Sequence, residues 1–311
     1  MTKVPCISVI ICTHNPRIQY LHQVLDRLRA QSQPSGDWEL IIVDNDSARP
    51  VLPQVDIEWH PQSRVVRESN LGLTNARIRG IREASADILC FVDDDNLLDS
   101  DYLRRALVLT EKYPAIGAFG GSIRPNFETD PPNWLGPYRE MLALRDVTRE
   151  LWTNAREAPF NPPCGAGLVV RRVVAKEYER QLELVTWRKS LDRRGTNLIS
   201  GGDTDLVLTA CDIGYGWGVF PELTLEHLIP SERLEWQYMM KLLTGITASV
   251  TVLRAKHGHA VGGFNSLERY ARWIANRILR GRRAADHFMA VERGRLEGKR
   301  ILARLGTPPA P

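Results

Sequence analysis

The chain has 311 residues, of which 43% are hydrophobic and 25% are charged, with 23 Gly and 19 Pro. These proportions are typical of a soluble globular protein and exclude disordered, collagen-like and disulfide-scaffold classes. The net charge of +4 is unevenly divided, because residues 231–311 carry 15 Lys and Arg against 6 Asp and Glu, which leaves residues 1–230 at −5. A basic tail behind an acidic body indicates a polyanionic partner for the tail, either nucleic acid or anionic lipid headgroups.

The cysteines indicate a reducing compartment. They are odd in number and far apart, and they form no C-x-x-C or zinc-type cluster: Cys6, Cys12, Cys90, Cys164 and Cys211. We therefore expect buried, reduced thiols. No apolar run reaches the roughly 18 residues of a membrane span, and the first residues lead into a strand pattern rather than a signal peptide. The sequence predicts a cytoplasmic protein that is neither secreted by that route nor integral to a membrane.

Buried strands alternate with helical spacing over the first hundred residues. The strand signatures are residues 6–12, 38–43, 65–67 and 87–92, and the helical stretches are 21–28 and 73–84. This alternation predicts an α/β fold with right-handed crossovers and a mostly parallel sheet.

Polar clusters follow three of these strands, at residues 13–15, 44–46 and 93–95. Because ligands of such sheets bind beyond the carboxyl ends of the strands, we expect the three clusters to line one crevice. Asp and Asn at these places can also be plain turn residues or helix N-caps.

The rest of the chain is less regular. Predicted elements are strands at 117–121 and 165–171, a long loop over 125–163, a helix from Leu206, short strands at 216–220 and 223–227, a helix from Leu234 and a second basic helical stretch from Leu267 to about Leu305. We expect one α/β domain over residues 1–230 and a basic helical extension over 231–311.

Three consecutive aspartates after a buried strand repel one another, and a divalent cation removes that cost. Carboxylate oxygens select hard ions such as Mg²⁺ and Mn²⁺, which share their coordination with substrate phosphates. The sequence has neither a P-loop nor a G-x-G-x-x-G turn opening its first helix. A nucleoside diphosphate is the ligand class that these features favour.

The motifs resemble those of the family 2 glycosyltransferases of GT-A fold, in the same order along residues 5–230. The matching segments are residues 7–15, 39–47, 68–77, 91–96 and 201–206. The resemblance implies an inverting, metal-dependent transfer of sugar from a nucleoside diphosphate to a glycan or lipid-linked glycan hydroxyl.

The resemblance also implies roles for single residues. Asp44 would accept from N3–H of the base, which favours UDP or dTDP, and Thr13 would contact the same nucleoside. Arg77 would lie along the nucleotide and Asp93 would contact the ribose. Asp95 would bind Mn²⁺ or Mg²⁺. The matched motifs add three further donor-binding positions: Asn15, Asn70 and Asp94.

Asp203 would be the general base, with Asp205 as the alternative carboxylate. Gly202 departs from the family pattern, which commonly has Glu at this position. His227 matches a His that reaches the metal or the diphosphate in some relatives, and it can equally be a packed or surface His.

Two other functions remain open from the residues. A sugar nucleotidyltransferase would need a Gly-rich basic loop after the first strand, where this chain has Thr13-His14-Asn15-Pro16-Arg17. A non-catalytic scaffold or nucleic-acid binder would use the basic tail. We expect no nucleic-acid partner. The tail is suited to the anionic inner face of a membrane, and it can instead cover the sheet or form a homo-oligomer contact.

Overall fold

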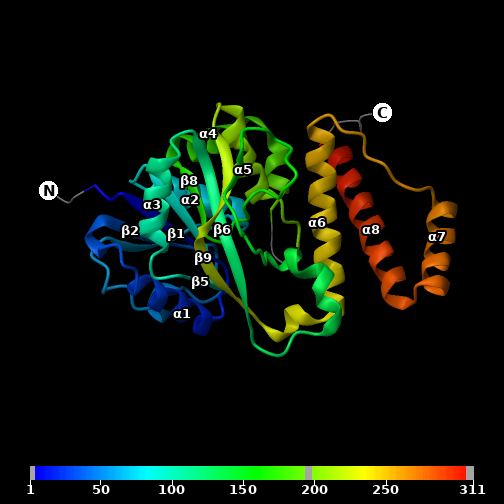
Figure 1. Ribbon diagram of the computed structural model, residues 1–311, viewed down its shortest axis with the longest axis horizontal. Helices are drawn as coiled ribbons and strands as arrows, with labels where there is room; N and C mark the ends of the chain where they lie inside the picture. The colour runs from blue at the N-terminus through cyan, green and yellow to red at the C-terminus, as the bar shows by residue number, and fades with distance from the viewer. Residues whose placement is uncertain (1–3, 193–197, 306–311) are drawn as a thin grey trace. The chain divides into compact units, whose positions relative to one another are not determined.

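The computed structural model describes residues 4–192 and 198–305 and divides into two compact units (Figure 1). The first unit comprises Met1–Asp130, Leu142–Leu184 and Asp203–Pro230. The second comprises Pro131–Met141, Val185–Gly202 and Ser231–Pro311. The second unit thus includes the predicted extension and two short segments that precede it in the sequence.

The first unit is built on one mixed, mostly parallel sheet in the order β3-β2-β1-β4-β8-β6-β9-β5, with β7 paired to β9. Its strands are β1 (Ile7–Thr13), β2 (Trp38–Asp44), β3 (Ser63–Arg67), β4 (Ile88–Asp93), β5 (Asn96–Leu98), β6 (Ile116–Phe127), β7 (Leu151–Thr153), β8 (Leu168–Arg171) and β9 (Gly216–Ile229). Strands β3, β2, β1 and β4 are mutually parallel, whereas β8 runs antiparallel to both β4 and β6. The fold class and the parallel first half are confirmed.

Helices flank this sheet. They are α1 (Ile18–Arg29), α2 (Leu73–Glu83), α3 (Tyr102–Lys112), α4 (Arg172–Leu184) and α5 (Gly202–Asp212). Strand β2 is buried along its whole length, as expected for a parallel strand covered on both faces. Helix α2 packs on β1 and β2, and the missing side chain of Gly80 lets it approach Ile10. Helix α2 is therefore packed directly on two of the strands whose carboxyl ends carry polar clusters.

Strand β9 and helices α3 and α4 differ from the prediction. The predicted strands at 216–220 and 223–227 are one strand, β9, whose pairing with β6 jumps from Gly121↔Phe220 to Ser122↔Thr224. Pro221 lies in this irregularity, where its missing N–H breaks no ladder bond. Helices α3 and α4 were not predicted, although their buried residues recur at helical spacing.

The prediction of buried cysteines holds only in part. All five thiols are free, but Cys90 alone is fully buried, Cys6 is exposed and the other three are partly buried. The long loop predicted over 125–163 contains the end of β6, a 3₁₀ stretch over Asn133–Leu142 and the short strand β7.

The second unit is mainly helical, with α6 (Trp236–Lys256), α7 (Ser266–Leu279) and α8 (Arg282–Arg304). The single helical stretch predicted from Leu267 is therefore two helices, because the chain breaks at Gly281, whose φ is +84°. In residues 4–192 and 198–305, no helix combines the length and hydropathy needed to cross a bilayer.

Helices α6 and α8 pack closely through small residues. A Cβ added at Gly294 would lie 2.5 Å from the Thr244 carbonyl oxygen and 2.6 Å from Thr247 Cβ. Gly298 has the same relation to Thr251, with an added Cβ 2.6 Å from its Cβ. Helix α7, by contrast, has no buried residue along its described length.

We predict that Gly294→Ala lowers the free energy of unfolding by about 1–3 kcal/mol through overpacking of α6 against α8. Helix propensity alone would raise that energy by about 1 kcal/mol, so the sign of the change separates the two effects. Gly262→Ala is the control, because nothing lies within 4 Å of an added Cβ there. Denaturant unfolding measures both, and a stabilised Gly294→Ala protein would contradict the close packing.

Candidate functional site

The carboxyl ends of β1, β2 and β4 meet at one edge of the sheet. Thr13 is in register with Asp44 across β1 and β2, and Cys12 is in register with Asp93 across β1 and β4. The polar clusters that follow these strands are thus brought together, as the sequence predicts. The same edge is where α/β sheets bind ligands.

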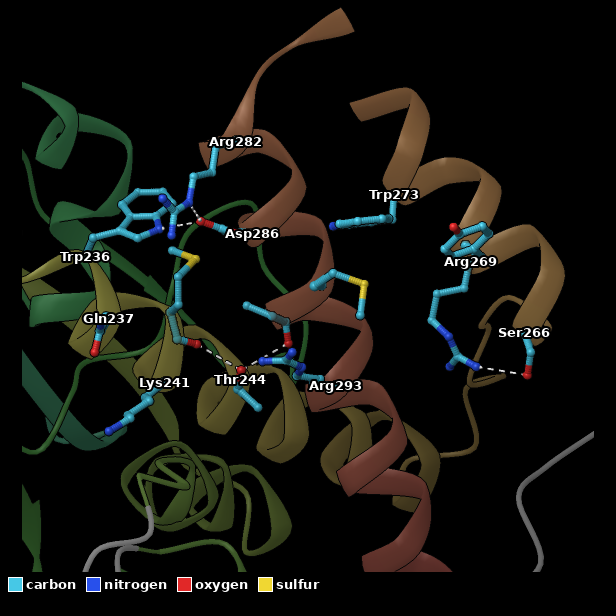
Figure 2. A pocket seen from close by; sticks show the side chains of 14 residues that line it. Trp236, Gln237, Lys241, Thr244, Ser266, Arg269, Trp273, Arg282, Asp286 and Arg293 are labelled. Atoms are coloured by element: carbon cyan, nitrogen blue, oxygen red, sulfur yellow. Dashed lines mark hydrogen bonds and ion pairs between the residues drawn. The ribbon is translucent and has the colours of Figure 1, made fainter. Parts of the chain in front are cut away.

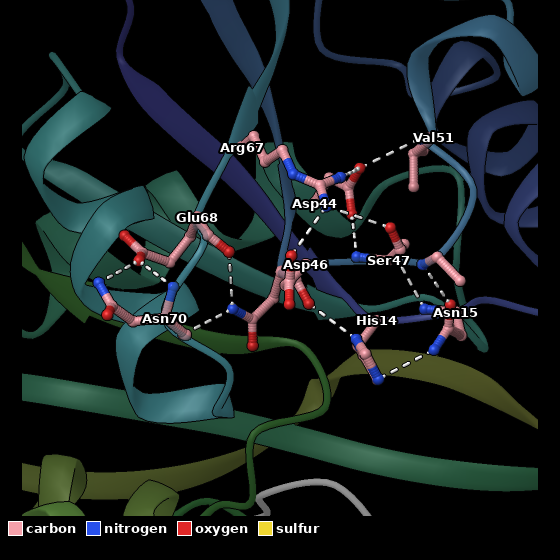
Figure 3. A network of polar contacts seen from close by, with 11 residues as sticks. His14, Asn15, Asp44, Asp46, Ser47, Val51, Arg67, Glu68 and Asn70 are labelled. Atoms are coloured by element: carbon pink, nitrogen blue, oxygen red, sulfur yellow. Dashed lines mark hydrogen bonds and ion pairs between the residues drawn. The ribbon is translucent and has the colours of Figure 1, made fainter.

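Asp44 is buried and holds the loop that follows its own strand (Figure 3). Its Oδ1 accepts the Ser47 N–H at 3.0 Å, and its Oδ2 accepts the Val51 N–H and the Arg67 Nη1 at 3.2 Å each. A carboxylate has about four lone-pair sites, so these three donors leave Asp44 Oδ1 able to accept one more. Asp44 can therefore order the loop and still receive a donor from a ligand.

Asn45 joins two loops at this edge and is likewise buried. Its Nδ2 donates to the Glu68 and Asn70 carbonyls at 3.1 and 2.8 Å, and its Oδ1 accepts the Gly72 N–H at 2.8 Å. The backbone of Asn70 is fixed by this contact, while the Asn70 side chain is exposed and donates to Glu68 Oε1 at 2.9 Å. The segment leading into α2 is thereby tied to the end of β2.

Asn15 has φ +50°, a left-handed conformation that Asn tolerates. Its N–H donates to Ser47 Oγ at 2.9 Å and its Oδ1 accepts the Ala48 N–H at 2.8 Å. Neighbouring His14 contacts the Asn45 carbonyl through Nδ1 at 2.7 Å. Asn15 and His14 thus link the loop after β1 to the loop after β2 (Figure 3).

Thr13 is buried and its hydroxyl donates to Asp94 Oδ2. This bond joins the end of β1 to the turn after β4. Asp93 and Asp94 are each partly exposed, whereas the next residue, Asp95, is buried. The three consecutive aspartates therefore have different surroundings.

Asp95 faces His227, which lies on β9 and is also buried. His227 Nε2 is 3.4 Å from Asp95 Oδ2, and its Nδ1 is 3.0 Å from the Leu142 carbonyl oxygen. Because a carbonyl only accepts, Nδ1 carries a proton, and Nε2 is the ring nitrogen that faces Asp95. Asn96, in register with His227, donates to Asp95 Oδ1 at 3.1 Å.

This arrangement fits a divalent cation that is shared with a substrate. A metal-binding His ordinarily donates its other N–H to a carbonyl or carboxylate, as His227 does to Leu142. Within residues 4–192 and 198–305, no group of three His, Cys, Asp or Glu side chains is arranged to hold a metal. Asp95 and His227 would supply two ligands, and Mg²⁺ commonly completes such a site with phosphate oxygens and water.

Arg77 and Asp203 meet at Gly165. Arg77 lies on α2 and is buried, and a Cβ added at Gly165 would lie 2.6 Å from its Nη2 and 3.7 Å from Asp203 Cβ. The Gly165 N–H donates to Asp203 Oδ2 at 2.9 Å, and the Thr204 N–H donates to Asp203 Oδ1 at 2.8 Å. The Arg77 guanidinium and the Asp203 side chain therefore both lie against the backbone at Gly165.

Cys164, which precedes Gly165, links this group to the aspartate run. Burial raises the pKa of its thiol; Arg145 opposes this rise, and the negative charges of Asp203 and Asp93 add to it. The thiol therefore stays protonated and unreactive near neutral pH. Asp93 and Asp203 both lie close enough to act on the same group.

The two acidic residues that open α5 differ in access. Asp203 is partly exposed, whereas Asp205 is 1% exposed. The space beside Gly202 is filled, because a Cβ added there would meet the carboxyl group of Asp192. A carboxylate from another segment thus lies against the position where the family commonly has Glu.

Sequence reasoning missed three residues of this edge. Arg67 ends β3 in register with Asp44, so a basic residue after the predicted strand at 65–67 was a usable signal. Asn45 was visible only as part of a polar cluster. The role of Gly165 had no sequence signal, because it depends on contacts with α2 and α5.

Relatives of this chain include an N-acetylglucosaminyltransferase of Sinorhizobium fredii, which is 25% identical over 247 residues, covering 75% of this chain and 56% of the relative. The succinoglycan biosynthesis protein ExoM of Rhizobium meliloti is 25% identical over 260 residues, covering 81% of this chain and 77% of the relative. The chain spans about half the length of the N-acetylglucosaminyltransferases that it matches.

The solved structure of S. aureus TarS 1–349 in complex with UDP has the same fold, with a TM-score of 0.53 at 16% identity over 97% of this chain and 92% of that chain. The family model described as glycosyl transferase family 2 matches residues 8–177, more than half of the chain. The chain therefore belongs to glycosyl transferase family 2.

Proposed function

We propose that this protein is a metal-dependent, inverting glycosyltransferase that moves a sugar from a nucleoside-diphosphate sugar to the hydroxyl of a glycan or lipid-linked glycan. The observation that carries the proposal is that Asp203, a partly exposed carboxylate, lies against the same backbone segment as the buried guanidinium of Arg77. A carboxylate that can accept a proton and a guanidinium that suits phosphate thus both lie close to Gly165, which supports the proposal.

The donor would bind over the ends of β1 and β2. The remaining lone pair of Asp44 Oδ1 suits the N3–H of uracil or thymine, so UDP and dTDP are the favoured nucleotides. TarS, which shares the fold, has been solved with UDP. Thr13 at the end of β1, and Asn15 and Asn70 in the loops after β1 and β3, would surround the nucleoside.

The diphosphate would lie beyond the aspartate run. Asp95 and His227 would hold Mn²⁺ or Mg²⁺, which when bound neutralises charge on the leaving diphosphate. Arg77 would offer forked N–H donors to a phosphate oxygen. Asp93 would contact the ribose, and Asp94, fixed by the Thr13 hydroxyl, would keep the turn after β4 in place.

Asp203 would take the proton of the acceptor hydroxyl as that oxygen attacks the anomeric carbon. Backbone N–H donors fix both of its oxygens, and each oxygen retains a lone pair for the proton. Asp205 is too buried to reach an acceptor. A single displacement assisted by one base inverts the anomeric configuration.

The acceptor is the less defined substrate. The basic residues of 231–311 favour association with an anionic membrane surface, which would place lipid-linked acceptors within reach. Incubating the pure protein with Mn²⁺ and UDP-, dTDP- and GDP-sugars, and measuring nucleotide release, tests the proposal. Release of no nucleoside diphosphate from any donor, with or without a glycan acceptor, would reject it.

We predict that Asp95→Ala abolishes the Mn²⁺-dependent part of UDP binding, because its carboxylate is one of two proposed protein ligands. Calorimetry with and without Mn²⁺ measures this. Asp130→Ala, which removes an exposed carboxylate of the same unit, is the control. Metal-dependent affinity that survives in Asp95→Ala would reject the assignment.

We predict that Asp203→Asn retains UDP binding and lowers turnover by a factor of order 10²–10⁴, because the amide keeps the shape and loses the proton acceptor. Asp205→Asn, two residues further along α5, is the matched variant. If Asp205→Asn were inactive and Asp203→Asn active, Asp205 rather than Asp203 would be the general base.

We predict that Asn45→Ala raises the donor KM more than it lowers kcat, since three bonds that fix the donor loops are lost. Unpaired buried groups should also lower the free energy of unfolding by about 2–3 kcal/mol. Asn126→Ala, whose exposed side chain donates to Glu226, is the control. Equal kinetic effects of the two variants would contradict the positioning role.

A further inference from the structure

The second unit contains a cavity of about 820 Å³ between α6, α7 and α8 (Figure 2). This volume is within the range of small-molecule sites. Trp236 and Met240 of α6, Tyr270 and Trp273 of α7, and Met289 of α8 supply apolar walls. Figure 2 shows Trp273 projecting from α7 toward α8.

The polar lining of the cavity is strongly basic. It includes Lys241, Arg269, Arg282 and Arg293. Among the described lining residues, Asp286 is the one carboxylate, and it already accepts the Trp236 Nε1–H at 3.0 Å and lies 3.8 Å from Arg282 Nε. The cavity therefore has an excess of positive charge that suits an anion.

Arg269, one of the lining residues, has a donor that such an anion could use. Its Nη2 donates to Ser266 Oγ at 3.3 Å, but its Nη1 is covered and has no hydrogen-bond partner among the described residues. A buried charged donor without a partner is costly, and a phosphate oxygen in the cavity would satisfy it.

The outer face of α7 adds an apolar surface beside the cavity. Leu267, Tyr270 and Ile278 recur at helical spacing and are 82%, 61% and 75% exposed, and Tyr270 also lines the cavity. No residue of α7 is buried in the described structure. A helix with this apolar stripe and flanking Arg residues is suited to a membrane interface.

Each simpler ligand uses only part of this arrangement. An uncharged sugar would not balance the excess positive charge of the cavity. Free phosphate would leave the aromatic and sulfur walls and the apolar stripe unused. An amphiphile with a phosphate headgroup uses all of them.

We propose that the cavity between α6, α7 and α8 binds the phosphate headgroup of a lipid, with Arg269 as its principal donor. The proposal deepens the membrane association inferred above and rests on it, but it does not depend on the sugar-transfer chemistry of the first unit. The source of the phosphate is either a bilayer phospholipid or an isoprenoid diphosphate that carries a glycan.

Vesicle binding by the full chain tests whether a site, rather than general surface charge, is responsible. Vesicles of phosphatidylcholine with and without phosphatidylglycerol are compared for Arg269→Gln and for Arg272→Gln, which removes the same charge from α7 but does not line the cavity. A site predicts a loss of about tenfold or more for Arg269→Gln. Screened surface charge predicts no more than about fivefold for either variant.

A loss of equal size in both variants, or no preference for phosphatidylglycerol, would overturn the proposal. Thermal melting checks that Arg269→Gln is folded. Arg293→Gln, whose exposed side chain lines the same cavity, is a second variant and should also weaken binding more than Arg272→Gln.

Water-soluble probes distinguish the sources of the phosphate. Calorimetry in EDTA compares dihexanoyl phosphatidylglycerol, farnesyl diphosphate and inorganic phosphate. Tighter binding of dihexanoyl phosphatidylglycerol indicates a bilayer lipid, and tighter binding of farnesyl diphosphate indicates an isoprenoid-linked acceptor. Binding of neither lipid phosphate, or equal binding of inorganic phosphate, would overturn the proposal. UDP binding with Mn²⁺ is measured in parallel, and its failure would count against the donor site alone.

Discussion

Repulsion between carboxylates at one edge of a parallel sheet is the constraint on which this structure depends. Parallel strands bring Asp44 and the run Asp93 to Asp95 to the same edge, where like charges destabilise one another. Separate partners resolve the conflict. Arg67 and backbone N–H groups neutralise Asp44, and the Thr13 hydroxyl holds Asp94. Asp95 faces His227 across 3.4 Å, and these are the two residues to which the proposal assigns a metal ion.

The sequence predicted this edge well because its signals are local. A buried strand ended by a polar cluster needs only consecutive residues to recognise, and three such ends on alternating strands imply a common crevice. The contacts that determine the surroundings of the side chains at this edge join residues far apart in the sequence. Asp95 meets His227 across 131 intervening residues, and Gly165 matters only because α2 and α5 both approach it. Pattern reasoning could nominate His227 but could not decide between a packed and a ligating His.

The errors in the predicted elements have the same origin. Pro221 and the irregular pairing beside it divide β9 into two apolar runs that read as separate strands, although β6 pairs with both. The helical pattern of the tail continues across Gly281, and only the left-handed backbone there shows that α7 and α8 are distinct. Because the chain turns at Gly281, α8 runs back beside α7, and both helices line the basic cavity together with α6.

Glycines allow close contacts in both units, but the groups that approach them differ. At Gly294 and Gly298 the close contact brings α6 and α8 together and leaves α7 outside their packed core, so α7 keeps an apolar stripe that the fold itself does not bury. At Gly165 it lets a guanidinium and a carboxylate share one backbone segment. In the first case the missing side chain lets two helices pack, while in the second it leaves room for the end of the Arg77 side chain. A substitution to Ala should therefore lower stability at Gly294 but chiefly displace the Arg77 guanidinium at Gly165, since the added Cβ would meet backbone and Thr247 at the first position and the end of a flexible side chain at the second.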